Sequence, residues 1–513
     1  MRIGVDVGGT NTDAVVMDGD RLVGAAKTRT TDAANIGIVL SIKKALKAAG
    51  LARSKIRAAM IGTTRITNAL AERRNLTPTA IVRLCLPANR AVRPMIDWPA
   101  DIAAAVGDHV YWAPGGAEFN GETFSPLDED KIRRIGRDVH EKGLRHIAIT
   151  GMFSPVNDAM EQRAAAIILE DYPHMGVTLS HHVGGLGFVE RENAAILNAA
   201  LGEIGLDIVA EFTMALKKAK ISAPMFISQN DGTLMTADWA RQYPIFMAKS
   251  GPTNSMIGAA HLSGVRNAVV VDIGGTTTDV GALFDGAPRE KSLNTDLCDI
   301  RTNFRMPDTI SIALGGGSKV AFDPALSIGP GSVARNLERR GVIFGGDVLT
   351  ATDIAVGAGR LKLGDRNRLG DISPEKIIKA DRRVQKIVAA AAEQMNLVST
   401  PAEIILVGGG ECLIGQTLKH AKSVSRPQYG NVANAVGAAV ARIGGEDSRI
   451  VSYWKKGREK AIDKAFARAR KRAAEAGADP ETVETVAVEE TSLSDRPGDR
   501  MRLRVKAAGK IMI

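Results

Sequence analysis

The sequence has few cysteines, no long apolar run and little aromatic content. Its 513 residues include three cysteines, Cys85, Cys298 and Cys412, which lie far apart and form no CxxC pair. This spacing argues against a disulfide framework or a structural zinc site and favours a reducing compartment. No uninterrupted apolar stretch reaches the roughly 18–20 residues that cross a bilayer, and the first apolar segment lacks the features of a signal peptide. We therefore expect a cytoplasmic protein without membrane association.

Aromatic residues make up 4% of the chain, which is little for a protein that stacks on bases. The formal net charge is nevertheless +10, and much of the excess lies within residues 455–472. The basic residues recur there at helical spacing, with Ala, Ile and Phe on the other side. Such a pattern is typical of a solvated helix face that packs on the body of a protein. We do not expect nucleic-acid binding.

An internal repeat is the decisive feature of the sequence. Residues 6–13 read DVGGTNTD and residues 272–279 read DIGGTTTD, so that six of eight positions are identical. An apolar run precedes each copy and a Val/Ala-rich run follows it, which predicts a strand, a tight glycine turn and a second strand. Two copies about half the chain apart are not a solenoid, whose period is about 20–50 residues. The repeat predicts an α/β protein with two similar lobes that face each other.

Alternating helix and strand patterns fill the rest of the chain. A proline-free helical pattern over about 192–216 predicts one long helix, which can connect the lobes. From about residue 446 the composition changes to a basic helix followed by two alternating strands. The predicted division is a first lobe over 1–190, a second lobe over 191–445 and a small C-terminal α+β module over 446–513.

A turn of the type Asp-x-Gly-Gly-Thr suits the phosphates of ATP. Its glycines let backbone N–H groups point into the space between the lobes, and threonine hydroxyls add donors. Mg²⁺ prefers one or two carboxylates together with phosphate oxygens, so Asp6 and Asp272 are its predicted ligands. The predicted phosphate contacts are Gly8, Gly9, Thr10, Thr12, Gly274, Gly275, Thr276 and Thr278. The alternative is a pair of ordinary hairpins, although turn chemistry does not require Thr and Asp to recur in register.

Two further glycine clusters follow the second copy, LGGGS at 314–318 and VGGGE at 407–411. A strand that ends in three glycines lets an adenine or ribose lie flat against the backbone. We therefore interpret Gly408, Gly409 and Gly410 as an adenosine contact. The alternative is a tight strand-to-helix turn.

Several other polar residues are candidates for chemistry, each with a structural alternative. Asp13 and Asp279 can position a magnesium-bound water or act as a base, or can simply cap the hairpins. Thr63 and Thr64 precede a helix, where free N–H groups favour anions, but threonine also caps helices there. The same alternatives hold for Ser250, which stands with Lys249 and Asn254 ahead of a small-residue helix.

The histidine pair His181-His182, near Glu190 and Glu192, can bind a metal or substrate. Adjacent side chains on a strand point to opposite faces, so both rings rarely bind one ion. Within the pair, His181 is the candidate for substrate contact.

Seven segments together resemble the hydantoinase/oxoprolinase family, in particular its ATP-binding hydantoinase A-type subunit. These segments are DVGGTNTDAVV, GTTRITNALAERR, SHHVGGLGFVERENAAILNAAL, SQNDGTLM, KSGPTNSMIGAA, VDIGGTTTDVGAL and ALGGGS. The resemblance spans about residues 2–445. It implies the fold of acetate and sugar kinases, Hsp70 and actin, with two RNase H-like lobes around the nucleotide. The sequence departs from the family pattern at Asn11, where members often carry Phe, and at 250–255, which read SGPTNS where many carry SGPAGG.

The resemblance implies an ATP- and Mg²⁺-dependent hydrolase that opens a cyclic amide such as a hydantoin or 5-oxoproline, while relatives carboxylate ketones. A separate B-type or other partner subunit and an oligomeric assembly are also implied. Two alternatives stay open: a small-molecule kinase, and a non-catalytic ATP switch or activator subunit of a partner enzyme.

Overall fold

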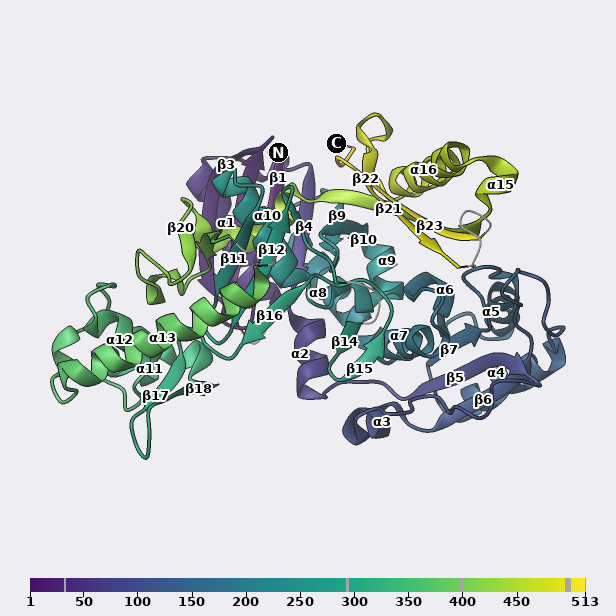
Figure 1. Ribbon diagram of the computed structural model, residues 1–513, viewed down its shortest axis with the longest axis horizontal. Coiled ribbons are helices and arrows are strands. Elements are labelled where there is room, and N and C mark those ends of the chain that lie inside the picture. Colours follow the sequence, from purple (N-terminus) through teal and green to yellow (C-terminus); the bar gives the residue numbers. More distant parts are fainter. Residues whose placement is uncertain (32–33, 292–294, 397, 399, 494–499, 513) are drawn as a thin grey trace.

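Two β-sheets with a similar hairpin in each form the centre of the molecule (Figure 1). The computed structural model describes residues 1–31, 34–291, 295–396, 398, 400–493 and 500–512. The two sheets confirm the predicted α/β fold with two duplicated lobes. No helix in these ranges combines the length and the apolar character needed to cross a bilayer.

The first sheet contains the first copy of the repeat. Among the described residues it has nine strands, in the order β22-β23-β21-β10-β9-β4-β1-β2-β3. Alternate residues of β2 face opposite layers, so Val16 packs with helices α1 and α8 while Val15 packs with α14. The elements are β1 (Arg2–Val7), β2 (Asn11–Asp18), β3 (Arg21–Arg29), β4 (Ala58–Thr63), β9 (Met225–Ser228), β10 (Thr233–Thr236), β21 (Arg442–Val451), β22 (Glu484–Ser492), β23 (Met501–Gly509), α1 (Ala34–Ala49), α8 (Gly202–Ala219) and α14 (Ala433–Val440).

The second sheet contains the second copy. Its main path runs β13-β12-β11-β19-β20, and β16 also pairs with β12. Val271 and Ile273 pack beneath α13 on one face, and Val270 packs against α10 on the other. The elements are β11 (Ala268–Ile273), β12 (Thr278–Phe284), β13 (Ala287–Pro288), β16 (Thr309–Ile312), β19 (Ala402–Val407), β20 (Ala421–Ser425), α10 (Ser250–Ser263) and α13 (Pro374–Met395).

Helices α10 and α14 carry the chain between the two sheets. Helix α10 leads from β10 to β11, and α14 leads from β20 back to β21. The two helices approach closely at glycines: a Cβ on Gly258 would lie 2.0 Å from the Ala433 carbonyl oxygen, and one on Gly437 would lie 1.9 Å from that of Asn254. Any larger residue there would push the helices apart. This contact joins the lobes at their centre.

The predicted helix over 192–216 is wrong as a single element and as a connector. The structure has α7 (Phe188–Ala200) and α8, separated at Leu201. The imidazole of His146 packs against Gly202, where an added Cβ would lie 2.1 Å from the ring, and the same imidazole contacts Glu203. Both helices are buried within the core that packs on the first sheet. They stay within one lobe, and α10 and α14 make the connections.

A third unit of parallel strands adjoins this core at the lower right of Figure 1. Its strand order is β6-β5-β7-β8, with apolar side chains packed beneath helices α4 and α5. Its strands and helices belong to the alternating helix and strand patterns that fill the rest of the sequence. The elements are β5 (Thr79–Leu86), β6 (His109–Pro114), β7 (His146–Gly151), β8 (Gly176–Leu179), α4 (Glu129–Glu141) and α5 (Ala159–Asp171).

The C-terminal segment joins the first sheet. Strand β23 pairs with β21 and β22, and helix α16 (Arg458–Glu475) covers them. The buried side of α16 is a stripe of alanines at four-residue spacing, and its lysines face outward. The first sheet therefore contains strands from all three predicted divisions, 1–190, 191–445 and 446–513. Strands β9, β10 and β21–β23 all belong to the sheet that contains β1.

Candidate functional site

The two repeated hairpins meet between the lobes. In each hairpin the paired strands place two aspartates opposite each other, Asp6 with Asp13 and Asp272 with Asp279. Equivalent bonds close the turns: Gly8 N donates to Asn11 O at 3.0 Å, and Gly274 N donates to Thr277 O at 2.9 Å. A Cβ on Gly275 would lie 3.0 Å from Thr10 Oγ1, so the turns are in contact.

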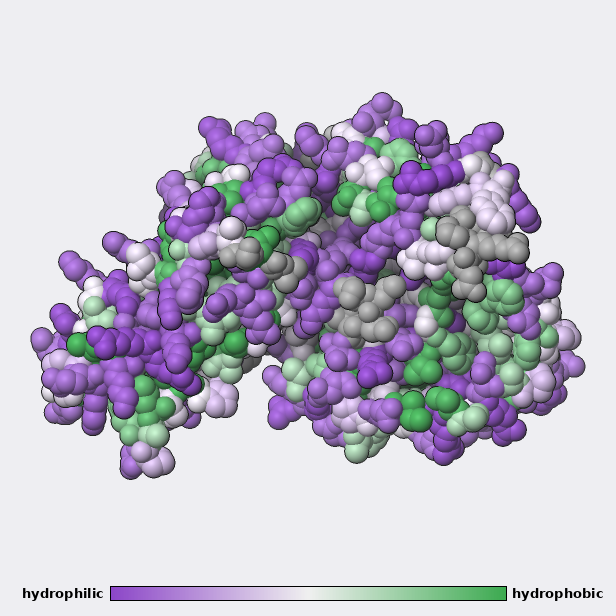
Figure 2. All heavy atoms as spheres, viewed as in Figure 1, coloured by the Kyte–Doolittle hydropathy of each residue, from purple (hydrophilic) through white to green (hydrophobic). Residues whose placement is uncertain are grey.

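The inner N–H groups of both turns are available to a ligand. Within the described residues, the N–H groups of Gly9, Thr10, Gly275 and Thr276 donate no hydrogen bond. A Cβ on Gly9 would meet no atom within 4 Å, so its backbone faces open space. Successive unbonded N–H groups form a concavity that favours anions. Figure 2 shows a recess in the surface between the two sides of the molecule, and hydrophilic residues surround it.

Asp6 and Asp272 are connected by neutral side chains from the two crossing helices. Asn434 on α14 donates through Nδ2 to Asp6 Oδ2 at 3.5 Å. Ser255 on α10 is hydrogen-bonded to Asp272 and also contacts Asn434. Asp6 and Asp272 are thus connected through the carboxamide of Asn434 and the hydroxyl of Ser255. The two aspartates belong to different lobes, and the two bridging side chains come from the two helices that join the lobes.

Burial and neighbouring carboxylates raise the pKa values of the hairpin aspartates. Burial, followed by the charge of Asp13, raises the pKa of Asp6 to about 7. Burial also raises the pKa of Asp279 to about 6 and shifts the pKa values of Asp13 and Asp272 upward. Close carboxylates disfavour each other's charged form, and a cation between them reverses this effect.

The residues present fit a hydrated magnesium ion. Asp6 Oδ1 and both polar atoms of the Asn254 carboxamide are buried without a hydrogen-bond partner. A Cβ on Gly62 would lie 2.7 Å from Asp6 Oδ1 and 2.7 Å from Asn254 Nδ2, so the two groups converge on one point. In the described part of the chain, no three His, Cys, Asp or Glu side chains gather as a metal cluster. This donor set matches Mg²⁺, which keeps waters and binds phosphate oxygens.

The glycine triplets pack beneath the second turn. Gly316 and Gly317 donate backbone hydrogen bonds to Gly274 and Gly275, at 3.0 and 2.7 Å. Gly410 donates to Ile273 O at 2.8 Å, and Gly408 has a φ of 86° beside Asp272. Only glycine fits such an approach. Of the predicted adenosine contacts, Gly408 and Gly410 support the turn, while Gly409 faces open space.

The other predicted threonines and the serine fall into two groups. Thr63 is paired with Val7 at the end of β1, and Thr64 follows it, so both lie beside the first turn. Thr63 Oγ1 accepts from Arg65 N at 3.2 Å, the side chain of Thr64 does not cap the helix that follows, and Ser250 is fully buried against Thr63. The hydroxyls of Thr12 and Thr278 are buried within their own lobes and bonded to Thr30 and to Leu314 O. They do not reach the turns.

The structure places His181 apart from the hairpins. His181 Nδ1 is 2.6 Å from Glu161 Oε2, and Glu161 also accepts bonds from Ser180 and Gly151 N. His182 contacts Tyr243, and burial lowers the pKa of His182 to about 4. The partners of both histidines come from the third unit and from the segment around Tyr243.

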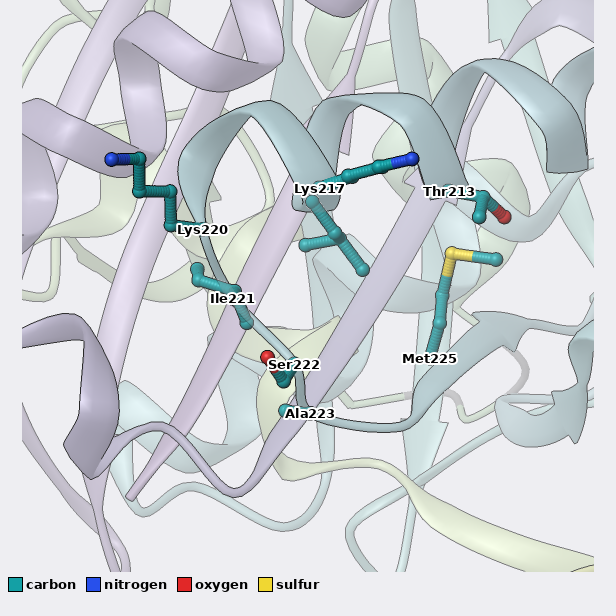
Figure 3. Close-up of a pocket in the computed structure, with 8 residues that line it drawn as sticks. Thr213, Lys217, Lys220, Ile221, Ser222, Ala223 and Met225 are labelled. Carbon is teal, nitrogen blue, oxygen red and sulfur yellow. The ribbon is translucent and has the colours of Figure 1, made fainter.

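A cavity of about 300 Å³ lies at the opposite end of the first sheet (Figure 3). It is lined by the end of α8 and by residues up to Met225, which pairs with Ala59 at the start of β4. The first glycine turn lies beside Thr63, at the other end of the same strand. Lys217 and Lys220 point in different directions at this cavity, so it does not form a convergent anion site.

Sequence patterns did not place three polar residues of the site beside the aspartates: Ser255, Asn434 and Asn254, whose carboxamide converges on one point with Asp6. A signal existed for two of them, because Asn254 and Ser255 fall in the SGPTNS segment that departs from the family's SGPAGG. Asn434 lies on a helix of small residues and has no motif of its own.

Two family models match successive parts of the chain. Residues 2–172 match the hydantoinase/oxoprolinase N-terminal region, and residues 191–397 match the hydantoinase/oxoprolinase model. The chain is similar to the acetophenone carboxylase gamma subunit of Aromatoleum aromaticum, with 27% identity over 423 residues, 74% of this chain and 56% of that one. It is also similar to caprolactamase subunit alpha of Pseudomonas jessenii, with 26% identity over 395 residues, 71% of this chain and 55% of that one.

Two solved structures share the fold over the whole chain. The ATP-dependent caprolactamase from Pseudomonas jessenii superposes with a TM-score of 0.76 at 17% identity, and nucleotide-free acetone carboxylase with a TM-score of 0.74 at 17% identity. Each match covers 100% of this chain and 88% of the other. The chain spans little more than half the length of the two curated relatives.

Proposed function

Because the chain belongs to the hydantoinase/oxoprolinase family, we propose that it is an ATP-dependent subunit that activates a cyclic amide for hydrolysis. The substrate class is a hydantoin or a 5-oxoproline-like lactam. The observation that carries the proposal is the pair of facing turns, whose unbonded N–H groups adjoin the partnerless oxygen of Asp6. A relative named caprolactamase supports the lactam class.

The chemistry explains the need for ATP. A cyclic amide is a poor electrophile, and transfer of the terminal phosphoryl group to its oxygen activates the carbon. Water then adds, the carbon–nitrogen bond breaks, and a second water cleaves the acyl phosphate to a carboxylate and free phosphate. Per ring opened, one ATP and two waters give ADP, phosphate and the ring-opened acid, which is an amino acid from a lactam and an N-carbamoyl amino acid from a hydantoin. Positioning and charge neutralisation provide most of the catalysis in such transfers.

The chain's own residues divide this work. The N–H groups of Gly9 and Gly275 bind phosphate oxygens, and Asp6 and Asp272 hold the magnesium ion through its waters. The bound ion neutralises charge on the phosphates. Asp279, which has only the Ser311 hydroxyl as a hydrogen-bond partner within the described chain, accepts the proton of the attacking water. Asp13 is neutralised by Lys27, with Nζ 2.6 Å from Oδ2, and holds the hairpin together.

A second candidate function is the activation of a ketone for carboxylation. The similarity to an acetophenone carboxylase subunit favours it, because the same phosphoryl transfer to a carbonyl oxygen serves both reactions. The relatives are named as subunits, which supports a separate partner chain, such as a B-type subunit, in the working enzyme.

Phosphate release by the purified chain tests these functions. The panel comprises hydantoins, lactams, 5-oxoproline, their ring-opened forms, and ketones with bicarbonate, each with and without a co-purified partner. We expect cyclic amides alone to raise the rate, and Asp272→Asn to remove the response. A response confined to ketones with bicarbonate supports the second function. If no substrate raises phosphate release in either condition, both functions are wrong and a kinase or switch takes their place.

A further inference from the structure

The side chain of Asn254 is a buried polar group without a hydrogen-bond partner. Asn254 lies near the start of α10 and is 0% exposed. Neither the oxygen nor the nitrogen of its carboxamide has a partner among the described residues. An amide that loses its hydration without gaining a hydrogen bond destabilises the folded protein, so such a group calls for an explanation.

The other buried asparagines of the described chain use their carboxamides. Asn198 is 1% exposed, and its Nδ2 donates to Thr178 Oγ1 at 2.8 Å and to Gln242 O at 2.9 Å. Its Oδ1 accepts from Ile245 N at 3.2 Å. Each of the remaining three has at least one hydrogen bond from its carboxamide: Asn193, Asn230 and Asn303. The carboxamide of Asn254 is therefore an exception within this molecule.

The carboxamide of Asn254 and the open oxygen of Asp6 face one place. A Cβ on Gly62 would lie 2.7 Å from Asn254 Nδ2 and 2.7 Å from Asp6 Oδ1, and glycine leaves that point free of a side chain. Asp6 Oδ2 already accepts from Asn434 Nδ2 at 3.5 Å, whereas Asp6 Oδ1 has no partner in the described chain. Two buried groups without partners thus flank a point that a side chain would otherwise fill.

The backbone of Asn254 is fixed, while its carboxamide can turn. A Cβ on Gly437 would lie 1.9 Å from Asn254 O, so α14 packs directly on this residue. The terminal torsion of asparagine is broad and roughly two-fold. A half turn therefore exchanges Nδ2 and Oδ1 and brings the amide oxygen toward Asp6 Oδ1 without any movement of α10. Amide and carboxylate oxygens are both ligands of hard divalent cations.

We propose that Asn254 binds the magnesium ion directly through Oδ1, in place of one of the waters of the ion. This inference rests on the proposed function, which supplies the cation, and adds to it a protein ligand from the helix that joins the two lobes. Asn254 falls in the SGPTNS segment, at a position where many members of the family carry glycine. The metal site of this chain therefore has a ligand that the common pattern does not provide.

Binding of Mn²⁺ in the presence of ADP tests the proposal. Mn²⁺ suits the same oxygen ligands, and its paramagnetic resonance reports both its affinity and the number of waters bound to it. Asn254→Ala is expected to bind Mn²⁺ about tenfold or more weakly and to leave one more water on the ion. An unchanged number of waters in the folded variant would show that Asn254 is not a ligand, whatever the affinity.

Asn198→Ala is the matched control, because it removes an equally buried carboxamide that is fully hydrogen-bonded. It is expected to bind Mn²⁺ with an affinity within about twofold of the unchanged protein. Without metal, it should unfold at a lower temperature than Asn254→Ala, which loses no hydrogen bond. A larger loss of thermal stability in Asn254→Ala would assign the carboxamide a structural role and contradict the proposal. If Asn198→Ala does not fold, Thr253→Val on α10 is the control, since Thr253 Oγ1 donates to Asn230 O at 2.8 Å.

A crystal of the unchanged protein with Mn²⁺ and ADP gives a readout that needs no variant. Anomalous diffraction locates the ion, and Asn254 Oδ1 is expected within about 2.5 Å of it. A longer distance contradicts the proposal, even if Asn254→Ala does not fold. Cyclic-amide-dependent phosphate release together with an ion that does not contact Asn254 would refute this inference alone. An ion bound by Asn254 without such release would refute the proposed function alone.

Discussion

The two hairpins have nearly the same sequence but different neighbours. Strand register pairs Asp13 with Lys27 on β3, and pairs Asp279 with Ser311 on β16. The first aspartate is therefore neutralised by a lysine, while the second is held by a hydroxyl. Exposure differs as well, since Asp13 is 7% exposed and Asp279 is half-buried. A repeated motif thus sets the backbone twice, and the adjacent strand decides whether the second aspartate of each copy has an ion pair.

The supports of the two turns differ in the same way. The first turn is held by side chains as well as by backbone: Thr30 donates through Oγ1 to Gly8 O at 2.8 Å and through N to Thr10 O at 3.0 Å, and Thr28 donates to Thr12 O at 3.1 Å. Backbone holds the second turn, through the triplets 315–317 and 408–410. Because hydroxyls can be removed singly and a glycine backbone cannot, the first turn is the one that mutation can loosen gradually.

The largest expected effect is at the first aspartate of each hairpin, which is the same in both copies of the repeat. Asp6→Asn and Asp272→Asn each remove a magnesium-facing charge, and each should lower ATP turnover by about 100-fold or more. Phosphate release at saturating ATP, with Mg²⁺ affinity measured separately, checks this. A loss in one variant only would show that the metal belongs to a single lobe.

The next effect tests the position where the hairpins differ. Asp279→Asn removes the proposed base and should lower the rate by about 100-fold or more. Asp13→Asn should leave the rate within about threefold, since its carboxylate already serves Lys27. Single-turnover kinetics of both variants compare them directly. Equal losses of rate in Asp13→Asn and Asp279→Asn would mean that the ion pair with Lys27 does not give the two aspartates different roles.

For the free energy of unfolding, we expect a change in the first hairpin to cost more than a change in the second. Lys27→Met leaves the buried Asp13 carboxylate without its ion pair, and should lower the free energy of unfolding by about 1–3 kcal/mol. Ser311→Ala removes a neutral partner from a half-buried group and should cost less than about 1 kcal/mol. Urea unfolding of the nucleotide-free protein gives both values. A larger loss of unfolding free energy in Ser311→Ala than in Lys27→Met would contradict this expectation.

The smallest effect is a pH dependence. Burial raises the pKa of Asp279 to about 6, so between its unfolded value and pH 6 the folded protein keeps a proton that the unfolded chain releases. This contribution to stability is complete at lower pH and is lost as pH rises through about 6. Asp279→Asn should therefore reduce the fall in unfolding free energy between pH 4 and pH 7 by about 1–2 kcal/mol. Identical pH profiles of the variant and the unchanged protein, measured without Mg²⁺, would contradict the raised pKa.

The sequence predicted the elements that depend on local patterns. The hairpins followed from the repeat, and the basic helix α16 followed from its helical spacing. Successive side chains of a strand point to opposite faces, so Thr12 and Asp13 lie on different faces of β2. The sequence could therefore have shown that Thr12 does not lie in the cleft beside Asp13. Gly202 was a visible signal for the break between α7 and α8, but its reason, the packing of His146, is tertiary.

The remaining site residues depend on contacts that no local pattern contains. Ser255 and Asn434 are 179 residues apart and meet only because α10 and α14 cross at Gly258 and Gly437. Lys27 becomes the partner of Asp13 through strand register, and Ser311 that of Asp279 in the same way. A turn motif predicts where a carboxylate stands, whereas its charge state depends on which strand lies alongside.

The position of β23 has a consequence for synthesis of the chain. The first sheet starts with residues 2–7, yet the strand between β21 and β22 consists of residues 501–509. A growing polypeptide must therefore wait for almost five hundred residues to leave the ribosome before this sheet is whole. Until then one side of β21 has unpaired backbone groups, which are open to pairing with other nascent chains. Exposure of this strand edge should accordingly end once β23 is inserted.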